Sequence, residues 1–191
     1  MNFLETPLAG LWIIEPKVFE DERGFFMETY HQEQFKAHGI ANVFVQQNHS
    51  RSKRGVLRGL HYQQEPFSQG KLVRVVRGEA FDVAVDLRPG SPTFGKWFGT
   101  TLSSENKILL YIPPGFAHGF CTLTDDVDFT YSCTNVYSAA HETGIIWNDP
   151  DLAISWPVAD PVVSAKDQHL PTLKTMPEYK SHIDIQSSRT Y

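Results

Sequence analysis

The stretch that decides the fold is Gly59-Leu60-His61-Tyr62-Gln63, together with Pro113-Pro114-Gly115-Phe116-Ala117-His118 further along the chain. Both histidines stand where a metal-binding double-stranded β-barrel carries its ligands. In such a barrel the first stretch would read His-x-His with a carboxylate nearby, but Tyr62 and Gln63 follow His61 here. A catalytic metal needs about three protein ligands and one open position. The sequence therefore predicts a barrel without a metal, in which His61 acts as a proton-transfer base.

Short strands separated by turns make up most of the remaining chain. Residues 81–87 and 127–133 alternate apolar and polar side chains, a period of two that is typical of half-buried strands. Turn residues such as Arg88-Pro89-Gly90 and Asp125-Asp126 lie between the strand-like stretches. Many strands at this spacing favour an all-β sandwich or jelly-roll barrel.

Helices are expected at only two places. Residues 31–38 suit a short helix that Gly39 would end, and Ser164 with Asp167 resembles a capping box at the start of another. The tail from about residue 171 is polar and shows no clear pattern. Because no repeat or linker is visible, residues 1–191 are expected to form a single domain.

The alternation also predicts which polar side chains point into the barrel. Tyr131 shares a face with Phe129, and Lys71 shares a face with Val73. A lysine in an apolar cavity is costly unless an anion meets it, so Lys71 indicates an anionic ligand.

Arg58 and His61 are harder to place together. By simple alternation they fall on opposite faces of one strand, unless Gly59 carries a β-bulge. A common ligand for the two side chains requires that bulge.

Composition narrows the class of protein. The 17 basic and 22 acidic residues give a net charge of −5 without a basic run, which argues against nucleic-acid binding. Aromatic residues make up 13% of the chain and suit flat ligands such as bases and sugars.

The location is expected to be cytoplasmic. No stretch approaches 18 apolar residues, so no membrane association is expected, and residues 1–7 lack the features of a signal peptide. Cys121 and Cys133 both lie in apolar, strand-like stretches. Buried free thiols are therefore expected, which suits a reducing compartment.

Ordered motifs through nearly the whole chain resemble one known family. They include Phe19-x-Asp21-Glu22-Arg23-Gly24-Phe25-Phe26, Gln46-Gln47-Asn48-His49-Ser50, Val56-Leu57-Arg58-Gly59-Leu60-His61, Gly70-Lys71-Leu72-Val73-Arg74, Ile112-Pro113-Pro114-Gly115-Phe116-Ala117-His118 and Ser164-Ala165-Lys166-Asp167. Together they closely resemble the dTDP-4-dehydrorhamnose 3,5-epimerases, a family of metal-free cupins. The resemblance implies a double-stranded β-helix (cupin jelly-roll) barrel with a few short helices, in a homodimer that exchanges N-terminal strands.

The resemblance also implies an activity without a cofactor. Such an isomerase inverts C3 and C5 of dTDP-4-dehydro-6-deoxyglucose through enolate intermediates, on the route to dTDP-L-rhamnose. It implies His61 as the base, Asp167 as the carboxylate that orients it, Tyr131 as the acid on the opposite face, and Lys71 as the stabiliser of the enolate oxygen.

Each of these four residues also has a structural interpretation from the residues alone. His61 and Tyr131 could be satisfied core side chains, Asp167 could only cap a helix, and Lys71 could extend to solvent from the start of a strand.

The remaining predicted contacts surround the nucleotide and the sugar. By resemblance, the substrate-binding residues are Arg23, Glu28, Gln46, Asn48, Arg58, His118, Tyr137, Glu142 and Lys166. Arg23 and Arg58 suit a diphosphate because guanidinium groups match phosphate oxygens. Tyr137 suits stacking on thymine, and rim packing is its structural alternative.

Three other classes of function remain open. A C3-only epimerase or a ketoisomerase on a related nucleotide sugar would share the fold, and Tyr131 argues against the former, because relatives that invert only C3 tend to lack this tyrosine. A metal-dependent cupin oxygenase is disfavoured by the lost His-x-His. A non-catalytic sugar-binding cupin would not need a complete set of acid–base groups.

Overall fold

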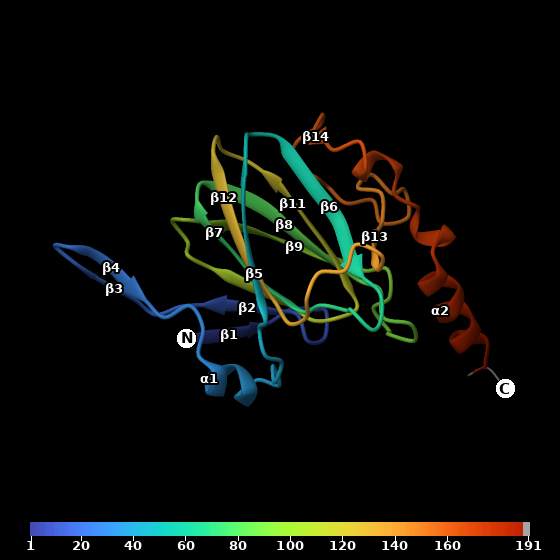
Figure 1. The fold of residues 1–191 in the computed structure, drawn as a ribbon, viewed down its shortest axis with the longest axis horizontal. Helices are drawn as coiled ribbons and strands as arrows, with labels where there is room; N and C mark the ends of the chain where they lie inside the picture. The colour runs from blue at the N-terminus through green and yellow to red at the C-terminus, as the bar shows by residue number, and fades with distance from the viewer. Residues whose placement is uncertain (189–191) are drawn as a thin grey trace.

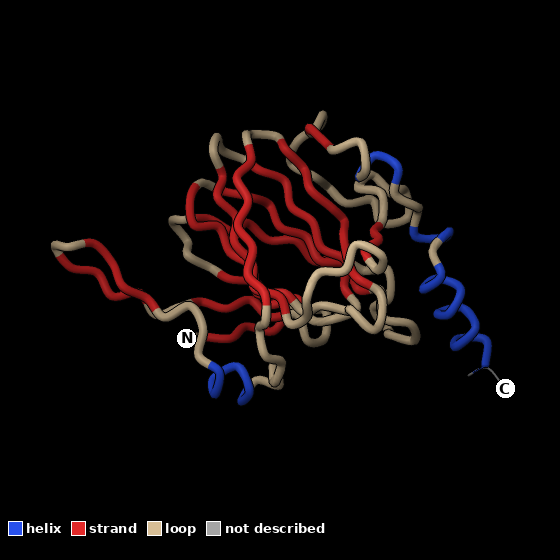
Figure 2. The backbone as a smooth tube through the Cα atoms, in the orientation of Figure 1, coloured by secondary structure: helices blue, strands red, loops and turns tan. Residues whose placement is uncertain are grey.

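Two facing β-sheets form the body of the computed structural model, which describes residues 1–188 (Figure 1; Figure 2). One sheet has the order β1 (Asn2–Glu5), β2 (Trp12–Glu15), β10 (Leu109–Ile112), β7 (Lys71–Arg77), β12 (Val127–Cys133), β5 (Gln46–Ser52). The other has the order β13 (Glu142–Gly144), β6 (Val56–Gln63), β11 (Phe116–Thr122), β8 (Glu79–Asp86), β9 (Trp97–Ser103), with β14 (Val162–Val163) parallel to β6.

The chain crosses repeatedly between these sheets. β5, β7, β10 and β12 belong to the first sheet, whereas β6, β8, β9 and β11 belong to the second. All pairs among these eight strands are antiparallel. The predicted cupin jelly-roll with few helices is therefore confirmed.

The core lies between the sheets. Val73 from β7 and Phe129 from β12 pack with Ala84 from β8 and Phe120 from β11, and all four are almost fully buried. The rings of Phe120 and Phe129 stack with centroids 4.0 Å apart. Burying such side chains from both sheets is the main force that holds them together.

The first predicted helix is present as α1 (Gln32–Ala37). Phe35 is fully buried and makes edge contacts with the rings of Phe3 and Tyr30. Gly39 has φ +79°, the left-handed conformation that commonly ends a helix.

The tail shows more structure than its composition indicates. Leu173 begins the 3₁₀ helix η2 (Leu173–Thr175), and Met176 directly follows it. Both side chains are buried against the outer face of the β6–β11–β8 sheet. The helix α2 (Pro177–Ser188) comes next, with Pro177 at its first position. The prediction of a patternless tail is therefore wrong: its two apolar anchors precede a helix that is too polar to show an apolar face.

A hairpin projects from the body (Figure 1). It consists of β3 (Val18–Asp21) and β4 (Gly24–Met27) and is called the N-terminal arm below. Its aromatic side chains are more than half exposed: Phe19 at 52%, Phe25 at 57% and Phe26 at 71%. Exposed aromatic groups of this size indicate a surface that another molecule covers.

Cys121 and Cys133 are buried free thiols, as predicted. Within residues 1–188, no helix has the length and apolar character needed to cross a membrane.

Candidate active site

A cavity of about 530 Å³ opens between the two sheets. His61 from β6, Lys71 from β7, Tyr131 from β12 and Asp167 from η1 (Asp167–His169) all line it, although they are far apart in sequence. An adjoining pocket of about 220 Å³ shares His61, Lys71 and Tyr131 with it. The combined space is of the size that small-molecule ligands occupy.

His61 is paired with a buried carboxylate. Its Nε2 lies 2.7 Å from Oδ1 of Asp167, and Oδ2 of Asp167 accepts a hydrogen bond from the Gly59 N–H at 3.2 Å. Ser164 Oγ accepts the Asp167 N–H, as a helix cap does. Among residues 1–188, however, the Ser164 N–H does not donate back to the Asp167 carboxylate, which instead binds His61 and the Gly59 N–H, so this half of the predicted capping box serves the histidine.

The pair is held ready for proton transfer. Burial raises the pKa of Asp167, but the hydrogen bonds from His61, Gly59 and Ser164 outweigh it and keep the pKa below its usual value. Because Nε2 faces this carboxylate, Nδ1 is the ring nitrogen left for the cavity. Within residues 1–188, Nδ1 of His61 has no hydrogen-bond partner.

A β-bulge brings Arg58 to the same cavity. His61 pairs with His118 across the β6–β11 ladder, whereas Arg58 pairs with Phe120, so β6 has one extra residue between them. The bulge needs glycine on both strands, since a Cβ on Gly59 would lie 2.5 Å from the Cα of Gly119. Simple alternation is therefore wrong between Arg58 and His61, and the chain has the β-bulge at Gly59 that a common ligand requires.

Lys71 is an almost unpaired cation inside the cavity. Among the described residues, its Nζ makes one hydrogen bond, to the carbonyl oxygen of His61 at 3.4 Å. Burial lowers the pKa of Lys71. The ammonium group therefore has donors left for an anion that forms in the cavity.

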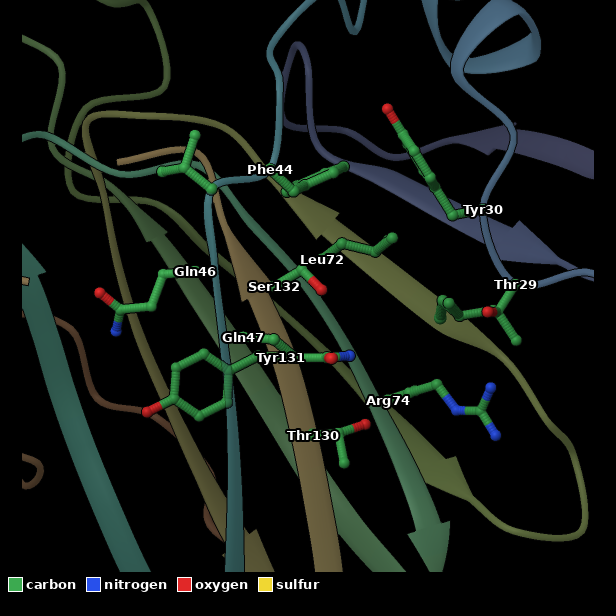
Figure 3. A pocket seen from close by; sticks show the side chains of 12 residues that line it. Thr29, Tyr30, Phe44, Gln46, Gln47, Leu72, Arg74, Thr130, Tyr131 and Ser132 are labelled. Carbon is green, nitrogen blue, oxygen red and sulfur yellow. The ribbon is translucent and has the colours of Figure 1, made fainter. Parts of the chain in front are cut away.

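Tyr131 points inward, as the alternation predicts. Figure 3 shows its ring directed away from Thr130 and Ser132, its neighbours on β12, which face an outer groove with Arg74. Burial raises the pKa of Tyr131, so its hydroxyl stays protonated and can donate.

The rim of the cavity is polar. Glu142 accepts hydrogen bonds from the Tyr137 hydroxyl at 2.8 Å and from the Lys166 ammonium. Gln46 donates to Asn48 at 3.1 Å and accepts the Tyr137 N–H at 2.9 Å. These contacts fix the Tyr137 backbone and hydroxyl while leaving half of its side chain exposed.

Two predicted contacts are not brought to the cavity by this chain. Arg23 lies on the N-terminal arm, where its guanidinium is 85% exposed and, among residues 1–188, bonds only to Asp21. Glu28 follows the arm and accepts a hydrogen bond from Gln34. The other seven substrate-binding candidates line the cavity or the adjoining pocket: Gln46, Asn48, Arg58, His118, Tyr137, Glu142 and Lys166.

One residue at the site was missed by the sequence analysis. Asp82 on β8 is fully buried, and its Oδ2 lies 2.8 Å from Nε2 of His118. In the sequence Asp82 falls on the polar side of the alternation with Val83, whereas the structure places it on the same strand face as the core residues Ala80 and Ala84. Among residues 1–188, no group of three or more His, Cys, Asp or Glu side chains is arranged to hold a metal.

The fold and the cavity together define a jelly-roll protein of the cupin type whose interior carries acid–base groups. The family model described as dTDP-4-dehydrorhamnose 3,5-epimerase matches residues 5–175. A Shigella flexneri dTDP-4-dehydrorhamnose 3,5-epimerase is 58% identical over 168 residues, covering 87% of this chain and 93% of the relative. The chain therefore belongs to the dTDP-4-dehydrorhamnose 3,5-epimerase family, and the predicted family and isomerase class are confirmed.

Solved structures agree with this assignment. A Legionella pneumophila dTDP-6-deoxy-D-glucose-3,5-epimerase in complex with dTDP-4-keto-L-rhamnose superposes with a TM-score of 0.88 at 51% identity, covering 92% of this chain and 94% of that one. A double mutant of a Streptomyces bikiniensis 3′-monoepimerase in complex with dTDP has a TM-score of 0.85 at 34% identity, covering 96% of each chain.

The monoepimerase changes the interpretation of Tyr131. In that double mutant a histidine became asparagine and a tyrosine became phenylalanine, at positions with the same sequence separation as His61 and Tyr131. A natural C3-only enzyme thus carries a tyrosine at this spacing. The expectation that Tyr131 by itself indicates double epimerisation is not supported.

Proposed function

We propose that this protein inverts both C3 and C5 of dTDP-4-dehydro-6-deoxyglucose, in the biosynthesis of dTDP-L-rhamnose. The observation that carries the proposal is the arrangement of the His61–Asp167 pair, Lys71 and Tyr131 around one cavity. Relatives that are 3,5-epimerases reach 58% identity, against 43% for a Streptomyces niveus 3-epimerase, which favours inversion at both carbons.

The chemistry follows from the position of the two carbons. Both flank the C4 ketone, so loss of a proton from either one gives an enolate. His61 Nδ1 takes the proton, and Asp167 stabilises the imidazolium that forms. Lys71 stabilises the negative enolate oxygen, and Tyr131 returns a proton to the opposite face of the ring. These steps move protons only and need no redox cofactor.

The nucleotide extends from the sugar toward the rim. Arg58 and Lys166 supply positive charge for the diphosphate, and the exposed ring of Tyr137 stacks on thymine. Gln46, Asn48 and Glu142 provide hydrogen bonds beside them. We further propose a cytoplasmic location, which suits the two buried free thiols.

A second copy of the chain completes the site. We propose a homodimer in which each N-terminal arm reaches the partner, so that Arg23 and Glu28 contact the substrate there. The exposed aromatic rings of the arm support this, as does an outer groove of about 450 Å³ lined by Tyr30, Phe44, Leu72, Leu109 and others (Figure 3).

A mixed dimer tests this exchange. We expect dimers of one His61→Ala chain and one Arg23→Ala chain to contain one intact site, because Arg23 of the first chain reaches His61 of the second. At low substrate concentration, the mixture should therefore exceed the activity of either variant alone by several fold. No gain after subunits are shown to mix would contradict the exchange.

Proton exchange tests the reaction itself. We expect the protein in D₂O to replace both the C3 and the C5 proton of dTDP-4-dehydro-6-deoxyglucose, followed by proton NMR. Exchange at C3 alone would establish the second candidate, a C3-only epimerase, which the likeness to the Streptomyces bikiniensis enzyme favours. Binding without exchange would leave a non-catalytic sugar-binding protein.

Asp167→Asn is expected to lower turnover by about 10²- to 10⁴-fold, between the effect of losing a partner of a metal-bound histidine and that of the same substitution beside a catalytic histidine base. The asparagine NH₂ can donate to Nε2 of His61 and so place the proton on Nδ1, where the base needs a lone pair. Steady-state rates at pH 5–8 check this, because the lowered pKa keeps Asp167 ionised throughout and the deficit should not vanish at lower pH. Unchanged turnover would contradict the orienting role.

A further inference from the structure

The cavity contains a second histidine–carboxylate pair. His118 faces His61 across the β6–β11 ladder, and its Nε2 lies 2.8 Å from Oδ2 of Asp82. The two histidines therefore stand side by side, and each has Nε2 on a different buried carboxylate.

Asp82 has no structural task comparable with that of its neighbour Asp86. Asp86 lies on the same strand and is equally buried, but it accepts hydrogen bonds from Arg88, Ser91 and Thr93 and so organises the following loop. Among residues 1–188, the Asp82 carboxylate has a single hydrogen bond, to His118, and its Oδ1 is buried without a partner. Since a buried carboxylate is costly, this contact needs a functional explanation.

The surroundings of His118 favour a neutral ring. The charged and titratable groups that act on it are Asp82 on β8, Lys71 on β7 and His61 on β6. Burial lowers the pKa of His118 and outweighs the effect of Asp82, which raises it. A neutral imidazole carries one proton, and a proton on Nε2 leaves a lone pair on Nδ1.

We propose that Asp82 is a positioning residue that holds His118 as the Nε2–H tautomer, so that Nδ1 accepts a hydrogen bond from a hydroxyl group of the sugar ring. The identity of the sugar ligand rests on the proposed function, whereas the contact between Asp82 and His118 does not depend on it. Within residues 1–188, Nδ1 of His118 has no partner, and the residue lines the cavity.

This assignment separates two tasks in the cavity. Lys71 donates a hydrogen bond to the enolate oxygen, whereas Nδ1 of His118 accepts a hydrogen bond from a hydroxyl group and has no proton to donate to the ketone. A site with a fixed acceptor discriminates against a sugar that lacks the matching hydroxyl, because the buried acceptor is then left unpaired. Asp82 would thus contribute to specificity for hydroxylated sugars without touching them.

The test compares tautomer and affinity in the same variants. Two-dimensional ¹H–¹⁵N spectra of the full-length protein distinguish Nδ1–H from Nε2–H, and the His118 signals are assigned by their loss in His118→Gln. Calorimetry gives the dissociation constants of dTDP-glucose, which carries the ring hydroxyls, and of dTDP, which does not.

We expect His118 to be the Nε2–H tautomer in the wild type and to shift to Nδ1–H in Asp82→Leu. Affinity for dTDP-glucose should then fall about tenfold, the effect of one lost hydrogen bond, while affinity for dTDP stays within about twofold.

Asp82→Asn provides the conservative comparison, since its amide oxygen can accept from Nε2. Whichever tautomer this variant adopts, the affinity for dTDP-glucose should follow it. Asp151→Asn, which removes a carboxylate paired with Lys174 outside the cavity, should change neither property. The proposal is overturned if wild-type His118 is Nδ1–H or doubly protonated, or if affinity does not follow the tautomer. A protein that binds no dTDP-sugar would instead refute the proposed function, and the spectra, recorded without ligand, would still report on Asp82.

Discussion

Replacing His61 with alanine is expected to slow proton exchange at both C3 and C5 by about 10³-fold, within the range for loss of a general base. Nδ1 of His61 faces the cavity, and the buried carboxylate of Asp167 holds its Nε2. Both carbons lose their protons next to the same ketone, so one base serves both steps. Exchange at C3 and C5 should therefore fall together, whereas binding of dTDP should change little. Proton NMR in D₂O measures both rates in one sample.

A second histidine with a carboxylate partner serves as the matched control. Nε2 of His49 lies 3.1 Å from Oδ1 of Asp128, and His49 does not line the cavity. The substitution His49→Ala should therefore leave both exchange rates unchanged. Substantial exchange at either carbon in His61→Ala would show that another group is the base there. His118 would then be the first residue to examine, because it is the neighbour of His61 on the cavity wall.

The fold was accessible from the sequence because alternation records burial directly. Val73 and Phe129 were placed on the inner face with Lys71 and Tyr131, and the structure has them there. Alternation failed at Gly59, where the extra residue of the bulge puts Arg58 and His61 on the same face of β6. Periodicity alone cannot locate a bulge, but a glycine between two functional candidates identifies the place to expect one.

The parts of the site that the sequence did not show depend on contacts between distant strands. Asp82 was missed because β8 is buried on both faces. The alternation of polar and apolar residues along this strand therefore did not show which face points into the barrel. Arg23 was found by its motif, but the position of the N-terminal arm depends on a surface beyond this chain. The tail helix was missed because tertiary packing of Leu173 and Met176, and not its own composition, fixes where it lies.

Replacing Tyr131 with phenylalanine is expected to separate proton removal from inversion. His61 can still take a proton and return a deuteron to the same face, since its side chain is 27% exposed and its ring can exchange with solvent. Without the Tyr131 hydroxyl, the acid proposed for the opposite face is missing. Inversion should therefore fall about 10³-fold, as for loss of a general acid, while exchange with retained configuration should fall less than about tenfold.

Proton NMR of the recovered sugar distinguishes these outcomes, because deuterium content reports exchange and ring couplings report configuration. Phenylalanine keeps the packing beside Phe129, so the fold should be maintained. An equal fall in exchange and inversion would mean that Tyr131 acts before the enolate forms. Unchanged inversion would assign the acid to another group or to water. Because tyrosine also occurs at this spacing in a C3-only relative, selective loss of inversion at both carbons is the result that would tie Tyr131 to double epimerisation.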